Sequence, residues 1–377
     1  MNMLTKLELH GFKSIRHLTD LALQPLNVLI GANGSGKSNL IAFFKLLSWM
    51  TASPGNLQFY IGKSGGANAL LHDGAAVTSQ IEASLTFETE AGTNEYAMRL
   101  FHAAPDTLIF AEEKYRSSQH SFGGTDNWTS LDAGHREAHI IDMAESGNAT
   151  AKTILWLLKT CVVYQFHNTS DTARIRQRWG LDDNRFLKED GANLAPFLLR
   201  LRDTQPKVYQ RTVATIRQIA PFFADFVLEP TDGRVILQWQ ERESDMIFGP
   251  HQASDGTLRM MALVSLLLQP TEDLPAVVIL DEPELGLHPY AINIIAGLLK
   301  SVATHTQVIL ATQSMTLLDY FDPEDIIIVD RPGRESVFKR LDAEKLQEWL
   351  EEYTLAELWE KNVIGGRPVH GPTAHGR

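Results

Sequence analysis

A glycine-rich segment that ends in lysine and serine constrains the fold of this chain more than any other feature. Residues Gly31 to Ser38 read GANGSGKS and match the pattern G-x-x-x-x-G-K-S. Its glycines let successive backbone N–H groups cradle phosphate oxygens, while Lys37 reaches the β- and γ-phosphates and the Ser38 hydroxyl ligates Mg²⁺. The apolar run at 26–30 predicts a strand before this loop, and apolar residues at helical spacing over 38–50 predict a helix after it. Strand, loop and helix are the context in which the pattern binds a nucleotide.

Two acidic residues follow a second apolar run. Residues 277–280 read VVIL, and Asp281 and Glu282 come next. A buried strand would deliver both carboxylates at its C-terminal end, where open α/β sheets bind ligands. There Asp281 would hold Mg²⁺, directly or through water, and Glu282 would position and deprotonate an attacking water. The pattern is weak alone, but with the glycine loop it predicts ATP hydrolysis.

A third motif, ASDGTLR at residues 253–259, precedes an apolar stretch at 260–268 that we expect to be helical. Ser254 at the helix N-cap, with Gly256 nearby, presents a hydroxyl and backbone N–H groups and could form another anion site. A simple helix cap is the alternative. The position of the motif just upstream of the Asp281 strand favours the anion site.

Periodicity along the chain predicts a mixed α/β fold with an antiparallel part. The expected strands cover residues 4–10, 26–30, 233–240, 276–280, 307–311 and 326–329, with antiparallel strands within 77–114. The expected helices cover residues 38–50, 148–160, 191–226 and 289–303, with one more after 311. The polar residues 117–134 suggest a loop, and the Gly/Pro/His-rich residues 365–377 suggest a disordered tail. We expect a nucleotide-binding head at 1–115 and 230–345, an inserted mainly helical region at 116–229, and a C-terminal helix and flexible tail at 346–377.

Composition narrows the setting. Cys161 is the single cysteine, so a disulfide framework is impossible and the reducing cytoplasm fits best. It lies in an apolar run and is expected to be buried. We expect no signal peptide and no membrane span, because no run of 18 apolar residues occurs. The formal net charge of −12 gives no support for a general nucleic-acid binder, although a local basic groove would still allow DNA as a partner.

Together these motifs resemble those of ABC-type ATPase heads, most closely the RecF/SMC/OLD-like group of AAA family ATPases. The resemblance rests on the glycine loop, the SDGT motif, the LDEPELGLHP segment at 280–289, the strand ending ATQS at 311–314, and the opening GFKSIR at 11–16. Three further stretches resemble those of stand-alone, single-head bacterial members: GANALLH at 66–72, DGANL at 190–194 and WEKNVIGGR at 359–367.

The resemblance implies a P-loop NTPase fold with an ABC-ATPase head: a mixed sheet, an antiparallel lobe and an inserted helical region. Two heads would sandwich two ATP molecules, so that the Ser254 motif of one subunit touches the γ-phosphate held by Lys37 of the other. The residues then expected at the nucleotide are Asn33, Gly34, Ser35, Gly36, Lys37, Ser38, Asn39, Ser254 and Gly256. Ser38 and Asp281 are the expected metal ligands, and Glu282 and Gln313 the expected catalytic residues.

Gln313 stands where many ABC proteins carry a switch histidine. A glutamine can orient a water or sense the γ-phosphate, but it cannot carry a proton as histidine does, which leaves the turnover rate open.

Other positions keep two interpretations. Gln165, in the stretch QFHNTS, would supply the glutamine that links the lobes to Mg²⁺, or simply end a strand. Lys13 and Arg16 would lie beside the nucleotide or be exposed turn charges. His288 is expected to be structural or part of a dimer seam. The basic run at 174–178 is expected to be a solvated helix face, with DNA as the alternative. His370 and His375 are too few to indicate a metal site.

Function follows as a hypothesis. Only 63 residues follow Ser314, which is too few for the nuclease domain that OLD-like relatives carry there. We therefore expect an ATPase that forms a homodimer or higher homo-oligomer and controls a separate effector, with a nuclease in antiviral defence as the leading candidate. A RecF-like DNA-repair or DNA-clamping ATPase is the alternative. A transporter ATPase subunit fits the GFKSI opening and the LHP ending less well.

Overall fold

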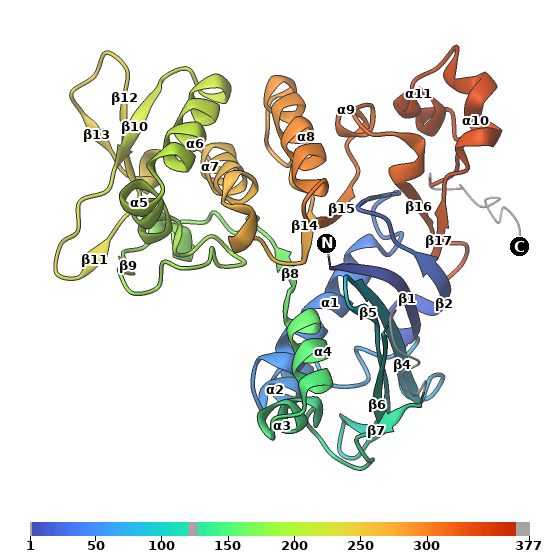
Figure 1. Ribbon diagram of the computed structural model, residues 1–377. Coiled ribbons are helices and arrows are strands. Elements are labelled where there is room, and N and C mark those ends of the chain that lie inside the picture. Colours follow the sequence, from blue (N-terminus) through green and yellow to red (C-terminus); the bar gives the residue numbers. More distant parts are fainter. Residues whose placement is uncertain (1, 120–126, 367–377) are drawn as a thin grey trace, which may run out of the picture. The chain divides into compact units, whose positions relative to one another are not determined.

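The structure, a computed structural model, describes residues 2–119 and 127–366 (Figure 1). The chain forms two compact units, and each is described by itself. One holds residues 2–160 together with the chain from Ala311 onward, and we call it the Lys37 unit; the other holds Cys161–Leu310, and we call it the Ser254 unit. These units are defined by compactness, which does not test the limits expected for the head (1–115 and 230–345) or for the inserted region (116–229). Those limits stay a prediction.

The Lys37 unit contains an antiparallel sheet, helices and a short parallel pair. Its elements are β1 (Met3–Phe12), β2 (Ile15–Ala22), β3 (Leu26–Ile30), α1 (Lys37–Ala52), α2 (Asn56–Lys63), β4 (Gln80–Thr89), β5 (Gly92–Ala103), β6 (Thr107–Gln119), β7 (Thr129–Ser130), α3 (Ile140–Glu145), α4 (Ala149–Lys159), α9 (Met315–Leu318), η4 (Pro323–Asp325), β16 (Ile326–Asp330), β17 (Val337–Arg340), α10 (Ala343–Leu350) and α11 (Leu355–Glu360).

Six strands of this unit form the antiparallel sheet, in the order β2-β1-β4-β5-β6-β7. Buried and half-exposed residues alternate along β4 and β5, because successive side chains of a strand point to opposite faces and only one face packs on the core. The antiparallel strands expected within residues 77–114 are therefore confirmed.

The strand before the glycine loop is buried on both faces. All five residues of β3 are buried, and β16 pairs with β3 in parallel while β17 pairs with β16 in antiparallel register. A strand covered on both faces reads as a continuous apolar run, which is why its bounds could be predicted. Helix α1 follows the loop and packs against α2 and α4, which anchors the loop on rigid elements.

The Ser254 unit carries the acidic strand. Its elements are β8 (Cys161–Tyr164), η1 (Arg174–Arg176), β9 (Trp179–Gly180), α5 (Leu194–Thr204), α6 (Pro206–Ile219), β10 (Phe223–Val227), β11 (Arg234–Val235), β12 (Gln238–Glu241), β13 (Ile247–Phe248), η2 (Pro250–Gln252), α7 (Asp255–Leu268), η3 (Thr271–Asp273), β14 (Val277–Asp281), α8 (Pro289–Ala303) and β15 (Gln307–Thr312), whose last two residues belong to the Lys37 unit.

Parallel pairing places the acidic strand beside the start of the unit. β14 pairs with β8 in parallel, with Val277 opposite the buried Cys161. Helices α5, α6, α7 and α8 pack on one another in sequence order, and β10, β12 and β13 form a small antiparallel sheet. His288 caps α8, because its Nδ1 accepts a hydrogen bond from the Tyr290 N–H at 3.3 Å.

The prediction of one helix over residues 191–226 was wrong, because this segment forms two helices and the second ends at Ile219. Pro206 separates α5 from α6, since proline starts a helix well but removes the hydrogen bond that would continue one. Pro221 disfavours helical geometry at Ala220, so α6 ends at Ile219 and β10 follows at Phe223.

Two other expectations also need correction. The strand expected at 233–240 is split, because β11 pairs with β9 whereas β12 pairs with β10. Part of the loop expected at 117–134 is strand instead, because β6 continues to Gln119 and Thr129–Ser130 form β7. Residues 120–126, and 367–377 with His370 and His375, lie outside the described residues. Among the described residues, the structure has no helix that is both long enough and apolar enough to cross a membrane.

Candidate nucleotide site

The lysine of the glycine loop, Lys37, donates hydrogen bonds to backbone carbonyls of the same loop. Gly34 and Gly36 have φ angles of 78° and 116°, which favour glycine, and α1 begins directly after Gly36. Lys37 is buried, and its Nζ donates hydrogen bonds to the carbonyls of Gly31 at 2.5 Å and Ala32 at 3.1 Å. An ammonium group at the centre of a glycine loop, beside the N-terminus of a helix, is a geometry suited to a polyphosphate.

A chain of hydroxyl groups supports the loop from the sides. Asn39 Nδ2 donates to Ser14 Oγ at 2.6 Å, and Ser336 Oγ donates to the Ser35 carbonyl at 2.6 Å. The 2.6 Å contact between the two hydroxyls is therefore a donation from Ser14 to Ser336. Ser14 belongs to the GFKSIR opening, but no sequence pattern pointed to Ser336, which comes from the turn before β17.

The remaining expected residues of this unit are placed as follows. Gln313 directly follows β15 and is half-buried, and Ser314 Oγ accepts the Leu317 N–H at the start of α9. Lys13 is half-buried, and burial, together with the nearby Lys45, lowers its pKa. Arg16 is exposed on β2.

In the Ser254 unit, two side chains hold the acidic strand end. Gln165 Nε2 donates to Asp281 Oδ2 at 2.7 Å. His167 Nε2 lies 2.8 Å from the Asp281 carbonyl, and since a carbonyl only accepts, this nitrogen carries the proton. Glu282 follows with a φ of 43°, a left-handed conformation that costs energy for a residue with a side chain and is typical of functional sites.

The Ser254 motif forms the expected N-cap. Ser254 Oγ accepts the Thr257 N–H at 3.1 Å, and its side chain is exposed. A Cβ at Gly256 would stand 2.5 Å from the Gly286 carbonyl oxygen, so only glycine lets α7 approach the turn after the acidic strand this closely. The motif is therefore in direct contact with the turn that follows the acidic strand.

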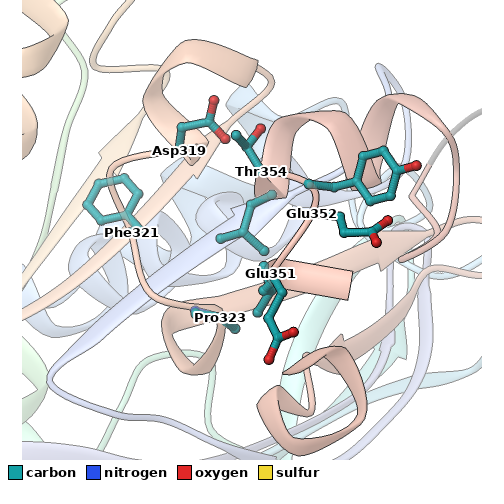
Figure 2. Close-up of a pocket in the computed structure, with 9 residues that line it drawn as sticks. Asp319, Phe321, Pro323, Glu351, Glu352 and Thr354 are labelled. Atoms are coloured by element: carbon teal, nitrogen blue, oxygen red, sulfur yellow. The ribbon is translucent and has the colours of Figure 1, made fainter. Parts of the chain in front are cut away.

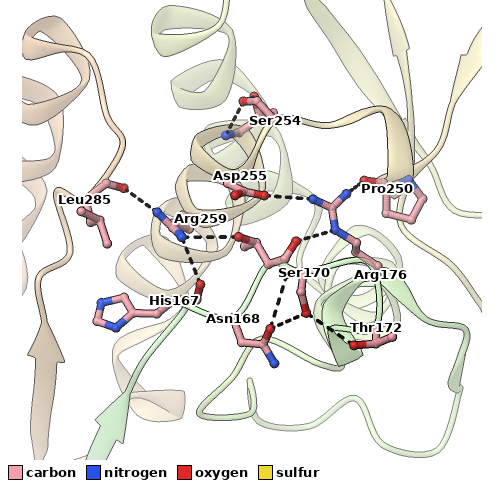
Figure 3. A network of polar contacts seen from close by, with 12 residues as sticks. His167, Asn168, Ser170, Thr172, Arg176, Pro250, Ser254, Asp255, Arg259 and Leu285 are labelled. Carbon is pink, nitrogen blue, oxygen red and sulfur yellow. Dashed lines mark hydrogen bonds and ion pairs between the residues drawn. The ribbon is translucent and has the colours of Figure 1, made fainter.

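Two arginines, to which the sequence analysis gave no structural role, join these parts (Figure 3). Arg259, on α7, donates from Nη2 to the His167 carbonyl at 3.0 Å and from Nη1 to the Leu285 carbonyl at 3.3 Å. Arg176 donates to the carbonyls of Thr169 and Pro250, and its Nη2 lies 3.1 Å from Asp255 Oδ1.

The basic run at 174–178 therefore differs from the expected solvated helix face. Only its first three residues form the short turn η1 (Arg174–Arg176), and Arg176 is buried. Only its neighbours face solvent: Arg174 pairs with Asp190 at 3.2 Å and lies over the Trp179 ring. The alternation comes from a 3-10 turn, which the charge pattern alone could not reveal.

A hollow of about 430 Å³ elsewhere in the Lys37 unit does not suit a nucleotide (Figure 2). It lies between the segment Asp319–Pro323 and the start of α11, and its polar lining includes the carboxylates of Asp319, Glu351 and Glu352. No lysine or arginine lines it, so a triphosphate would be repelled. Among the described residues, no cluster of three or more His, Cys, Asp or Glu could hold a metal ion.

Comparisons with known proteins identify the family of the chain. Residues 26–319 match the family described as "AAA domain, putative AbiEii toxin, Type IV TA system". Over 107 residues the chain is 33% identical to the energy-coupling factor transporter ATP-binding protein EcfA2 of Staphylococcus aureus (strain bovine RF122 / ET3-1), covering 26% of this chain and 35% of EcfA2. The chain thus spans about a third of the length of the curated relatives that it matches.

Solved SMC heads share the fold. The SmcHead bound to the C-winged helix domain of ScpA aligns with a TM-score of 0.62 at 17% identity, covering 92% of this chain and 99% of that one. The Smc head with an extended coiled coil from Pyrococcus furiosus, bound to the C-terminal domain of ScpA, aligns with a TM-score of 0.59 at 16% identity, covering 93% and 99%. The chain belongs to the AAA_21 family of AAA domains and is a P-loop ATPase of the ABC/SMC type.

Proposed function

We propose that the chain binds ATP with Mg²⁺ and works as a nucleotide-dependent dimeric switch for a separate effector protein. The single observation that carries this proposal is the network of the Ser254 unit. There, Asp281 is held by Gln165, and the Ser254 motif touches the turn after Asp281. A motif for sensing phosphate and a motif for hydrolysis are thereby built into one connected structure.

The residue roles follow from their chemistry. Asn33 to Asn39 surround the triphosphate, with Lys37 as the cation, and Ser38 and Asp281 offer the hard oxygen ligands that Mg²⁺ prefers. Glu282 acts as the base toward water, and Gln313 orients that water or senses the γ-phosphate. Gln165 is the glutamine that fixes the Asp281 carboxylate toward the metal, as outer-shell partners of metal ligands do.

Dimerisation is proposed because the Ser254 motif presents groups that suit a phosphate of a second copy. Its hydroxyl is exposed, and the N-terminus of α7 adds the positive end of a helix dipole. A γ-phosphate held by Lys37 of a second copy would satisfy this turn. ATP would then act as part of the interface between two chains.

An effector partner is proposed on two grounds. The SMC heads that share this fold are seen with domains of ScpA, so heads of this type do receive partner proteins. The family description names a toxin–antitoxin system, which supports a role in defence and a toxic effector such as a nuclease. DNA as a direct partner is the alternative that the test below separates.

The test is the variant Glu282→Gln, with Glu272→Gln, an exposed glutamate of the same unit, as the matched control. We expect Glu282→Gln to bind ATP but to hydrolyse it at least 100-fold more slowly, which corresponds to an activation free energy higher by about 3 kcal/mol. The variant should elute as a dimer when ATP and Mg²⁺ are present. A variant no more dimeric than the wild type would refute the ATP sandwich. Stimulation of the wild-type ATPase by DNA alone would favour a DNA-clamping role over an effector switch.

A further inference from the structure

The last described segment of the chain returns to the glycine loop. After α11, backbone hydrogen bonds from Lys361, Asn362 and Val363 back to the helix reverse the chain. The segment then reaches the loop, where the Gly366 carbonyl accepts the Ala32 N–H at 2.9 Å. We call residues 361–366 the C-terminal strap. It overlaps the WEKNVIGGR stretch, which the proposed function leaves without a role.

Two glycines allow the strap to lie this close. Gly365 and Gly366 have φ angles of 86° and 84°, which side-chain-bearing residues adopt only at a cost. A Cβ at Gly366 would stand 3.0 Å from Trp359 Nε1, 3.2 Å from Ile328 Cγ2 and 3.6 Å from the Gly31 Cα. The positive φ angles therefore favour glycine, and an added Cβ at Gly366 would force Trp359 and Ile328 to shift by a few tenths of an ångström.

The strap contacts Ala32, whose carbonyl also accepts a hydrogen bond from the Lys37 side chain. The Ala32 carbonyl accepts hydrogen bonds from Lys37 Nζ and from the Ser35 N–H, both at 3.1 Å, while its N–H is taken by Gly366. Ala32 is thus held by hydrogen bonds from within the loop and by one hydrogen bond to the strap. Arg331, which directly follows β16, donates from Nη1 to the Gly34 carbonyl at 3.2 Å.

We propose that the C-terminal strap is a positioning element of the nucleotide site, which holds the glycine loop in the shape that receives the triphosphate. A loop ordered in advance binds its ligand without the cost of ordering, so loss of the strap should weaken ATP binding. The proposal rests on nucleotide binding by the loop. It adds that this binding depends on residues about 330 positions further along the sequence, the separation between residues 31 and 361 (361 − 31).

Two truncations and one substitution test the strap. A chain that ends at Gly366 keeps the strap and loses residues 367–377, while a chain that ends at Lys361 loses those residues and all of the strap except Lys361. Gly366→Ala disturbs the contact with one methyl group. Gly147→Ala is its matched control, because Gly147 also has a positive φ, 99°, but an added Cβ there would meet nothing within 4 Å. The probe is the non-hydrolysable analogue AMP-PNP with Mg²⁺, and the readouts are its Kd and the Tm of the nucleotide-free protein.

We expect the chain ending at Gly366 and the Gly147→Ala variant to bind within about twofold of the wild type. The chain ending at Lys361 and Gly366→Ala should bind on the order of tenfold more weakly, a difference of about 1.4 kcal/mol. A purely structural role would lower Tm without this loss of affinity, and wild-type affinity in both strap variants would overturn the proposal.

Hydrogen exchange on the unaltered protein gives a second test that needs no variant. The Ala32 amide should be protected without nucleotide, and AMP-PNP should increase protection in residues 361–366. Fast exchange at Ala32, or no response of the strap, would contradict the proposal even if the truncated chains fail to fold. Lys37→Ala distinguishes the two failures: if that variant binds AMP-PNP normally, the loop assignment itself is wrong.

Discussion

Gln165 donates a hydrogen bond from Nε2 to Asp281 Oδ2 at 2.7 Å, across 116 residues of sequence. Parallel pairing of β8 with β14 brings the two residues together, because both lie at the C-terminal ends of neighbouring strands. The contact fixes one oxygen of a carboxylate that is expected to hold Mg²⁺, directly or through water. It therefore leads to a prediction about metal dependence as well as about rate.

Replacing Gln165 by methionine keeps its volume and removes the hydrogen bond. We expect kcat for ATP to fall by about 10- to 100-fold, and the Mg²⁺ concentration for half-maximal rate to rise, because outer-shell partners orient metal ligands. Initial rates over a Mg²⁺ titration measure both quantities. Gln177→Met, at an exposed position of the following segment, is the control. An unchanged Mg²⁺ dependence in Gln165→Met would contradict the role.

Lys37→Ala should greatly weaken ATP binding while the fold survives. The buried ammonium is the cation of the loop, and a charged hydrogen bond to phosphate contributes about 1.5–3 kcal/mol, so affinity should fall at least tenfold. Calorimetric titration with ATP and Mg²⁺ measures the loss. Lys63→Ala removes an exposed lysine at the end of α2 and should bind as the wild type does. Binding of normal affinity by Lys37→Ala would refute the phosphate-loop assignment.

Sequence patterns predicted the parts of the site that depend on local order. The bounds of β3 and α8 were found, because a fully buried strand and a helix that starts with proline leave clear local patterns. The cap at Ser254 was found for the same reason, since its hydrogen bond spans three residues.

The parts that were missed depend on contacts between distant segments. Nothing near Ser336 indicates that it meets Ser14, 322 residues away. Arg176 looked like a surface charge because burial of an arginine is decided by the carbonyls around it, here those of Thr169 and Pro250. Helix limits near Pro221 were missed because the apolar pattern of α6 continues into β10, and periodicity alone does not separate the two.

Arg176 should matter for stability. Methionine at this position would remove the Arg176 donor from the buried Thr169 carbonyl and leave the Pro250 carbonyl with only the Ala253 N–H at 3.3 Å, and a buried unsatisfied acceptor costs about 1–3 kcal/mol. We expect the free energy of unfolding to drop by about 3 kcal/mol. Urea unfolding, followed by circular dichroism, measures it. Arg178→Met, two residues away and exposed, should change it by less than about 0.5 kcal/mol. Equal effects of the two variants would show that the buried hydrogen bonds of Arg176 do not contribute to the stability of the fold.

A buried carboxylate in the Lys37 unit makes its stability depend on pH. The Glu113 side chain is fully buried, accepts the Tyr96 hydroxyl at 2.8 Å, and accepts the N–H of His139 at 2.8 Å and of Ile140 at 3.2 Å. It thereby caps the start of α3. Burial nevertheless raises the pKa of Glu113, because the charged form loses its hydration, although these hydrogen bonds oppose the shift.

The direction of the pH effect follows from proton linkage. With its pKa raised above the ordinary value of about 4.3, the folded protein keeps a proton on Glu113 that the unfolded chain has already released. The contribution of Glu113 to stability is therefore largest below about pH 4.3 and decreases as pH rises through the raised pKa. Glu113→Gln cannot ionise, so the free energy of unfolding of the wild type minus that of this variant should be smaller at pH 8 than at pH 5. Urea unfolding of both proteins at the two pH values measures this difference, with Glu112→Gln on the same strand, where the side chain is 43% exposed, as the control. A difference that stays constant or grows with pH would show that the buried carboxylate is already ionised at the ordinary pKa.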